Sequence, residues 1–187
     1  MDHGDHVALL RPGIAALGGT WADLGSGSGA FTLALADLLG PGARIVSVDG
    51  DARALRQQAD AVARRFPAVS LDQRVADFTR PLELPPLDGI VMANSLHFVH
   101  DQATALRALV AQLRPGGRFI LVEYDAEHGN PWVPHPISFA RWQRLAPEAG
   151  LTGVRLLHRV PSRFLGSIYS SAADRAEAPR TPATTRS

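Results

Sequence analysis

The sequence predicts an α/β fold, in which helices cover both faces of a mostly parallel sheet. Strand-like and helix-like segments alternate along the chain with turn residues between them, as βαβ units require. The 187 residues are 45% hydrophobic and 20% charged, which suits one domain with a sizeable core. The first predicted strand runs into "GSGSG" (25–29), at the sheet edge where ligands of parallel sheets bind.

Short apolar or β-branched runs predict the strands, and longer runs with helical spacing of apolar residues predict the helices. Strands are expected over 20–24, 43–49, 68–77, 87–95, 115–125 and twice within 154–172. Helices are expected over 29–40, 51–66, 101–114 and 137–150. Asp51 and Asp101 are placed to cap two of these helices, and Pro147 to split or kink the last one.

Composition limits the class of protein. We expect one domain over 1–173, with residues 1–19 as an N-terminal helical cap and 174–187 as a disordered tail, because that tail has no apolar periodicity. The N-terminus lacks the features of a secretory signal, and no apolar run is long enough to cross a bilayer, so a cytoplasmic protein without membrane contact is expected. A net charge of +1 gives no support for a nucleic-acid partner.

The glycine run predicts a nucleoside-containing ligand. A strand, a glycine-rich turn and a helix together offer main-chain N–H groups and a helix N-terminus to a ligand. Asp49 follows Gly29 by twenty residues, at the end of the second strand, where a carboxylate can accept from ribose hydroxyls. The pattern Gly25-x-Gly27-x-x-Ala30 also fits a dinucleotide, but Asp23 would repel a pyrophosphate and attract a cationic ligand.

"DLGSGSG" resembles the first motif of the class I S-adenosylmethionine-dependent methyltransferases. "VSVDGD", "VADF", "DGIVMANSLHFVHD", "LRPGGRFILVEYD" and "RWQRLAPEAGL" are similar to later motifs of that family, in the family's order, over roughly residues 20 to 170. The resemblance implies a three-layer Rossmann-like methyltransferase fold, with a seven-stranded mostly parallel sheet and an antiparallel last strand. It also implies S-adenosyl-L-methionine (SAM) as cofactor and S-adenosyl-L-homocysteine (SAH) as product.

The resemblance further implies the cofactor contacts. The implied residues are Asp23, Gly25, Ser26, Gly27, Gly29, Asp49, Gly50, Asp77, Phe78 and Asn94. Asp23 and the glycine backbone would face the methionine part, Asp49 both ribose hydroxyls, and Asp77 the adenine amino group. Each role has a plainer alternative: Asp23 holds the glycine loop through backbone N–H groups, Asp77 is a turn residue, and Phe78 belongs to the core.

Methyl transfer from a sulfonium is an in-line displacement that needs no metal, and it needs a base only if the acceptor loses a proton. His97 is the candidate base, with packing under the adenine or helix capping as its alternatives. Glu123, Tyr124, Trp132 and His135 are the hypothesised lining of the acceptor pocket.

The sequence therefore favours a SAM-dependent methyltransferase that acts on a small molecule, as a monomer or homodimer. Three alternative functions compete with this one. The acceptor could be a protein or an RNA, or the domain could bind SAM or SAH without turnover. A NAD-type oxidoreductase is disfavoured by Asp23 and by the absence of any lysine for a Tyr-x-x-x-Lys motif.

Overall fold

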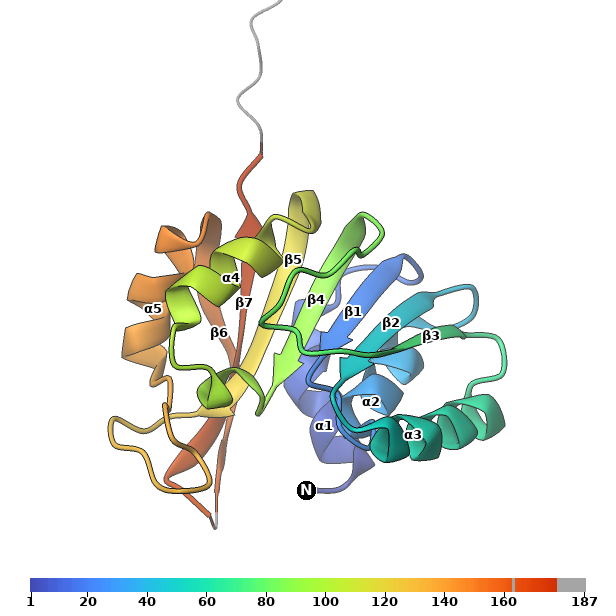
Figure 1. Ribbon diagram of the computed structural model, residues 1–187, viewed down its shortest axis with the longest axis horizontal. Coiled ribbons are helices and arrows are strands. Elements are labelled where there is room, and N and C mark those ends of the chain that lie inside the picture. The colour runs from blue at the N-terminus through green and yellow to red at the C-terminus, as the bar shows by residue number, and fades with distance from the viewer. Residues whose placement is uncertain (163, 178–187) are drawn as a thin grey trace, which may run out of the picture.

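In the computed structural model, which describes residues 1–162 and 164–177, the chain forms three layers with one seven-stranded sheet in the middle (Figure 1). The strand order is β3-β2-β1-β4-β5-β7-β6, and β7 runs in the direction opposite to the other six strands. The strands are β1 (Thr20–Leu24), β2 (Arg44–Asp49), β3 (Ser70–Val75), β4 (Leu87–Ala93), β5 (Leu113–Tyr124), β6 (Leu151–Pro161) and β7 (Ser167–Arg175). The predicted sheet is confirmed.

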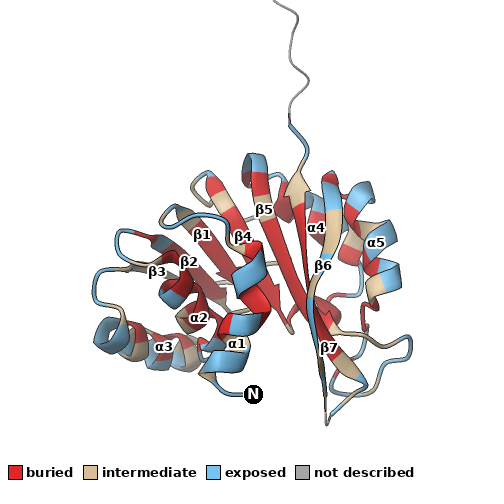
Figure 2. Ribbon diagram, turned by 180° about the vertical axis from the view of Figure 1, so that it is seen from behind, coloured by how far each residue is buried: buried red, intermediate tan, exposed pale blue. Residues whose placement is uncertain are grey.

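Helices cover both faces of this sheet, as predicted. They are α1 (His3–Leu10), α2 (Ala30–Leu39), α3 (Ala52–Arg65), α4 (Gln102–Val110) and α5 (Phe139–Glu148), with single 3₁₀ turns η1 (Arg11–Gly13) and η2 (Leu96–Phe98). Helices α1, α2 and α3 lie on one face, and α4 and α5 on the other (Figures 1 and 2). Asp51 and Asp101 cap α3 and α4 by accepting from backbone N–H groups, which confirms both predicted caps.

The sheet separates two apolar cores, because successive side chains of a strand point to opposite faces. From β1, Ala22 and Leu24 enter the core under α4 and α5, whereas Trp21 enters the core under α1 and α2. Gly89 lies beside Trp21 on β4, and a β-carbon there would come within 2.3 Å of the indole ring. Buried residues accordingly line the middle strands in Figure 2.

Several details of the elements differ from the prediction. Helix α4 ends at Val110 and β5 begins at Leu113, because Leu113 pairs with Leu87 before a register shift that takes up "RPGG" (114–117). Helix α5 continues through Pro147, in its last turn, and is not split there. Strand β7 extends to Arg175, two residues past the expected end of the domain, and the tail expected to be disordered lies outside the described residues from 178 on.

The connection between β3 and β4 carries no helix. Residues 76–86 join β3 to β4 as an extended segment that crosses the sheet on the side of α4 (Figure 1). Phe78, Leu82 and Leu84 of this segment pack partly buried against the core of that side. None of the residues from 76 to 86 is fully buried. Among the helices of the described residues, none has the length and apolar character to cross a membrane.

Candidate functional site

The glycine loop turns sharply at the carboxyl end of β1. Gly25, Gly27 and Gly29 adopt φ values of 74°, 53° and 90°, which strain any residue that has a β-carbon. The N–H groups of Gly25 and Ser26 donate to the Val48 carbonyl at 2.8 and 3.2 Å, which ties the loop to β2. A β-carbon on Gly25 would lie 2.4 Å from that of Ser95, so glycine is also required for space.

Asp49 organises the loop from the end of β2. Its Oδ2 accepts from the Gly27 N–H and its Oδ1 from the Asp51 N–H, both at 2.8 Å. A carboxylate oxygen can accept more than one hydrogen bond, so both oxygens keep capacity for a ligand's hydroxyl donors. The Asp49 carboxylate thus fixes the loop and can still accept hydrogen bonds from a ligand.

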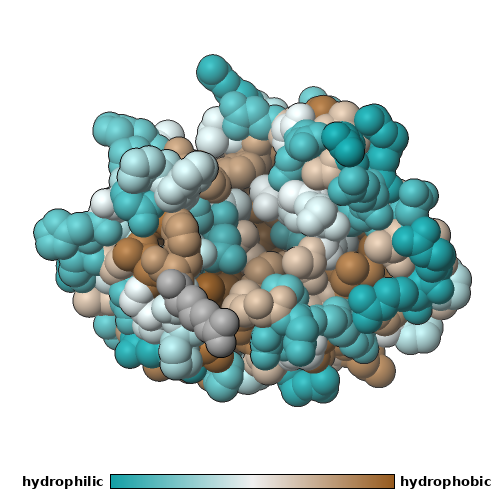
Figure 3. All heavy atoms as spheres, turned by 90° about the horizontal axis from the view of Figure 1, so that it is seen from below, coloured by the Kyte–Doolittle hydropathy of each residue, from teal (hydrophilic) through white to brown (hydrophobic). Residues whose placement is uncertain are grey.

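A cavity of about 470 Å³ opens at this edge of the sheet, and we call it the cofactor cavity. Its lining residues are Gly25, Gly27, Asp49, Gly50, Ala76, Asp77, Phe78, Asn94, Ser95 and Phe98. Seven of the ten residues predicted to bind the cofactor are among them; the other three, Asp23, Ser26 and Gly29, are not. Figure 3 looks onto this edge and shows a recess with apolar patches between hydrophilic rims.

The three predicted residues outside the lining support the loop from behind. The Ser26 hydroxyl is 2.7 Å from that of Ser47 on β2. Gly29 caps α2 and packs against Gln58, whose Cγ would be 2.4 Å from a β-carbon at Gly29. Asp23 is only 1% exposed, and its side chain accepts from the Thr32 hydroxyl. It is therefore hydrogen-bonded to α2 and not to backbone N–H groups of the glycine loop.

Asp23 belongs to a buried chain of side-chain hydrogen bonds. Gln73 on β3 donates to Gln58 Oε1 at 3.1 Å, Gln58 donates to Thr32 Oγ1 at 2.8 Å, and Thr32 donates to Asp23 Oδ2 at 2.5 Å. Burial raises the pKa of Asp23 to about 7, although the Thr32 hydrogen bond lowers it, and the neighbouring carboxylate of Asp49 adds a smaller increase. Sequence reasoning missed this chain, because polar residues within helices are usually solvated.

Two lining residues bear directly on ligand binding. Asn94, just after β4, has a φ of 51°, and its side-chain Oδ1 is buried with no hydrogen-bond partner. Such an unpaired buried acceptor is costly, so it marks a place where a donor can bind. Asp77 accepts from the N–H and hydroxyl of Thr79, as a turn residue does, and it lines the cavity as well.

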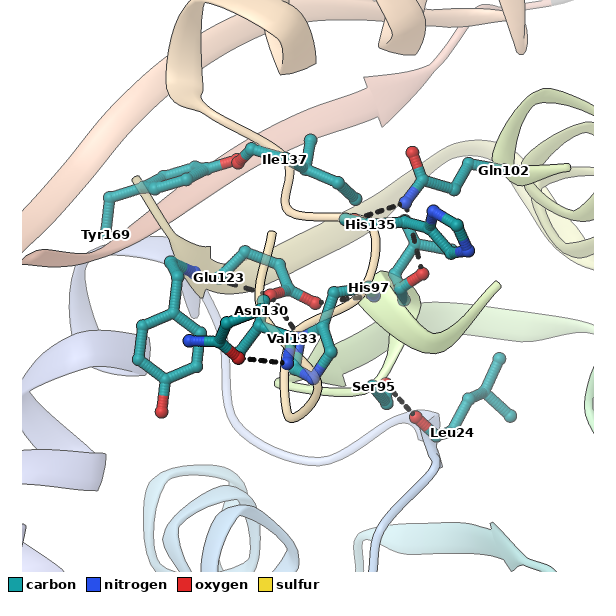
Figure 4. Close-up of polar contacts among 12 residues, drawn as sticks. Leu24, Ser95, His97, Gln102, Glu123, Asn130, Val133, His135, Ile137 and Tyr169 are labelled. Carbon is teal, nitrogen blue, oxygen red and sulfur yellow. Dashed lines mark hydrogen bonds and ion pairs between the residues drawn. The ribbon is translucent and has the colours of Figure 1, made fainter. Parts of the chain in front are cut away.

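His97 and Glu123 form a buried pair between η2 and the end of β5 (Figure 4). The side chain of His97 is 3% exposed and that of Glu123 is 0% exposed. Nδ1 of His97 is 2.7 Å from Glu123 Oε2, and the His97 N–H donates to Oε1 at 3.1 Å. An ionised carboxylate only accepts, so the tautomer with its proton on Nδ1 satisfies this hydrogen bond and leaves Nε2 without a proton.

The four residues hypothesised to line the acceptor pocket are not brought together around one cavity. Glu123 is occupied with His97, and Trp132 is 71% exposed. His135 packs its ring against His100 at 5.1 Å. Only Tyr124 lines a cavity, a second one of about 650 Å³ that shares Asn94 with the cofactor cavity.

Phe98 and Ser95 are lining residues that sequence reasoning missed. Phe98 is 63% exposed, although it is large and apolar, and its ring lies 4.3 Å from that of His97. The Ser95 hydroxyl donates to the Leu24 carbonyl, which joins the ends of β4 and β1. Both lie shortly after β4, and this position at the carboxyl edge of the sheet is the sequence signal that could have identified them.

In the described part of the chain, no group of three or more His, Asp or Glu side chains is placed to hold a metal ion.

Comparison with known proteins gives consistent matches. A family model described as a methyltransferase domain matches residues 22–119. A 37.1 kDa protein in transposon TN4556 of Streptomyces fradiae is 34% identical over 116 residues, which are 62% of this chain and 31% of that protein. The ubiquinone/menaquinone biosynthesis C-methyltransferase UbiE of Ectopseudomonas mendocina is 28% identical over 123 residues, which are 65% of this chain and 46% of that protein. The chain thus spans less than half the length of these two curated relatives.

Solved structures share the fold. The 1,6-didemethyltoxoflavin-N1-methyltransferase of Burkholderia thailandensis, with bound 1,6-didemethyltoxoflavin and SAH, superimposes with a TM-score of 0.74 at 20% identity. The match covers 94% of this chain and 78% of that one. At this identity the likeness shows the fold, and it confirms the predicted Rossmann-like methyltransferase architecture.

Proposed function

The chain belongs to the methyltransferase-domain family that matches its residues 22–119, and we propose that it transfers a methyl group from SAM to a small-molecule acceptor. The observation that carries this proposal is the gathering of seven predicted cofactor residues around one cavity. The Burkholderia structure supports SAM as the cofactor, because it contains bound SAH. The 1,6-didemethyltoxoflavin bound there is a small molecule, and so are the ubiquinone and menaquinone for which UbiE is named.

The residues present suit SAM. The cavity offers a carboxylate at Asp49 for ribose hydroxyls and aromatic surface at Phe78 and Phe98 for a purine. Asn94 supplies an unpaired buried acceptor, which suits the donors of an amino-acid ammonium group. The Asp49 carboxylate at the loop favours a ligand with positive charge.

Bound SAM would supply a methyl group on a sulfonium, which leaves as a neutral thioether, so the protein needs no metal to activate it. The protein's tasks are then to hold the acceptor in line and to exclude water. His97 would take a proton from the acceptor at Nε2, while Glu123 holds the ring in the required tautomer. We therefore propose that Glu123 positions the base, and not that it lines the acceptor pocket.

Titration calorimetry with SAM, SAH and NAD tests the cofactor. We expect SAM and SAH to bind and NAD not to bind, and NAD binding without SAM binding would overturn the proposal. A screen of acceptors with methyl-labelled SAM then tests turnover. Binding of SAM with no transfer to any small molecule, protein or RNA would favour the alternative of a non-catalytic SAM-binding module.

A further inference from the structure

The second cavity lies beside the cofactor cavity and is walled by elements far apart in the sequence. Its volume is about 650 Å³, compared with about 470 Å³ for the cofactor cavity. His6 of α1 lines it from one side, Tyr124 at the end of β5 from another, and Phe164 in the turn between β6 and β7 from a third. Asn94 lines both cavities, so a ligand in one adjoins a ligand in the other.

Two aromatic rings form one wall of this second cavity. The Tyr124 and Phe164 rings have centroids 5.7 Å apart and are tilted by 54°. Phe164 is 52% exposed, so this large apolar ring has a free face at the cavity. Aromatic rings prefer other rings at such distances, which favours a flat, unsaturated ligand over a saturated one.

Two of the side chains that line this cavity, those of His6 and Tyr124, are uncharged near neutral pH, whereas Asp5 and Met1 line it as well. Burial lowers the pKa of His6, and the N-terminal amino group adds to this lowering, so its imidazole is neutral there. His6 is also fixed, because its ring lies 4.7 Å from Phe31 in an edge-on contact. Burial and the charge of Glu123 raise the pKa of Tyr124, so its phenol keeps its proton and can donate. A hydroxylated ring matches such a pair of neutral partners.

The candidate base, His97, lines neither cavity, but its ring lies next to one lining residue of each. The His97 ring is 6.0 Å from the ring of Tyr124 and 4.3 Å from that of Phe98, which lines the cofactor cavity. A ligand of the second cavity that contacts Tyr124 would therefore be one side chain away from the proton acceptor. This argument rests on the methyltransferase function proposed above.

We propose that the second cavity binds the methyl acceptor, and that this acceptor is a planar hydroxylated aromatic ring held against Tyr124 and Phe164. The acceptor's O–H proton goes to His97 Nε2, and its oxygen forms a bond to the methyl carbon of SAM. The sulfur–methyl bond breaks, and its electron pair stays on sulfur, which gives SAH.

Saturation-transfer NMR with β-naphthol, in the presence and absence of SAH, tests this site. We expect β-naphthol to bind and its saturated analogue β-decalol not to bind. Phe164→Ala should weaken β-naphthol binding about 10-fold. Tyr124→Phe, which keeps the ring, should weaken it less. Trp132→Ala is the matched control, because Trp132 is an exposed aromatic outside both cavities, and it should bind as the wild type does.

The outcomes separate this proposal from the proposed function. Absence of β-naphthol binding, equal binding of β-decalol, or full binding by Phe164→Ala would overturn the acceptor site while SAH binding stands. Loss of SAH binding with β-naphthol still held at Phe164 would overturn the cofactor assignment instead. Transfer of labelled methyl to β-naphthol, lost in Phe164→Ala and kept in Trp132→Ala, would support both.

Discussion

The hydroxyl of Thr32 donates to Oδ2 of Asp23 at 2.5 Å, in the interior behind the glycine loop. Thr32 is the third residue of α2, and Asp23 is the penultimate residue of β1, so this hydrogen bond spans the loop from behind. Gln58 of α3 donates to the same hydroxyl oxygen, which leaves the Thr32 proton no acceptor other than Asp23 among these side chains. The loop that faces the cofactor cavity is thus held by three elements.

The raised pKa of Asp23 predicts a stability that depends on pH. The folded protein keeps this proton up to about pH 7, whereas the unfolded chain releases it near pH 3.8. Between these values the folded state binds more protons, so Asp23 makes the free energy of unfolding fall as pH rises from about 4 to about 7. Asp23→Asn should remove this fall and be more stable than the wild type at pH 8, by up to about 4 kcal/mol. Urea unfolding of both proteins at several pH values measures this, and parallel curves would contradict it.

Gln58→Leu is expected to destabilise the protein. The substitution removes two hydrogen bonds, the one that Gln58 donates to Thr32 and the one that it accepts from Gln73, each worth about 0.5–1.5 kcal/mol. Gln57→Leu is the matched control, because Gln57 is the preceding residue and is exposed. Chemical denaturation should show a lower unfolding midpoint for the Gln58 variant alone. Equal midpoints for both variants would show that the buried chain does not stabilise the fold.

Asp49→Ala should weaken SAM binding by on the order of 2–4 kcal/mol, or roughly 30- to 700-fold. The variant loses the carboxylate for the ribose and also the acceptor for the Gly27 N–H. Asp51→Ala, two residues away, removes only a helix cap and should leave the SAM affinity close to normal. Calorimetry on both variants separates these roles, and a similar affinity in both would argue against Asp49 as the ribose ligand.

Glu123→Gln should lower the turnover rate about 100-fold at saturating SAM, because the amide no longer holds His97 as a carboxylate does. The SAM dissociation constant should not change, since Glu123 does not line the cofactor cavity. Glu127→Gln, in the exposed loop that follows, provides the control. The variant should also alter the pH profile of kcat, which a purely structural role would leave in place. Wild-type turnover in Glu123→Gln would remove His97 and Glu123 from the proposed chemistry.

The sequence was informative where a local pattern dictates the structure. Alternating strand and helix signals predicted the sheet, and the glycine run predicted the loop, because positive φ values and close approach both require glycine. Asp49 ends a strand, Asp77 and Asn94 lie just after one, and the carboxyl ends of parallel strands meet at one edge of the sheet. The sequence alone therefore allowed the inference that these three residues lie near one another.

The remaining features depend on contacts between distant segments. Glu123 pairs with His97 across 26 residues, and no local pattern distinguishes this glutamate from one that faces solvent. Gln58 lies in a helix with many polar residues, and only the position of Thr32 makes it a buried donor. The second cavity combines α1 with the β6–β7 turn, which are separated by most of the chain. Such pairings follow from packing rather than from sequence spacing.

The segment between β3 and β4 carries Asp77 and Phe78, yet it contains no helix and none of its residues is fully buried. It is held by the partly buried contacts of Phe78, Leu82 and Leu84 with the core beside α4, rather than by a helix of its own. The Asp77 side of the cofactor cavity is thus walled by a single loop segment, whereas the Gly25 side is walled by residues at the ends of strands. Substitutions in this segment should therefore reshape one wall of the cavity without interrupting any helix or strand of the fold.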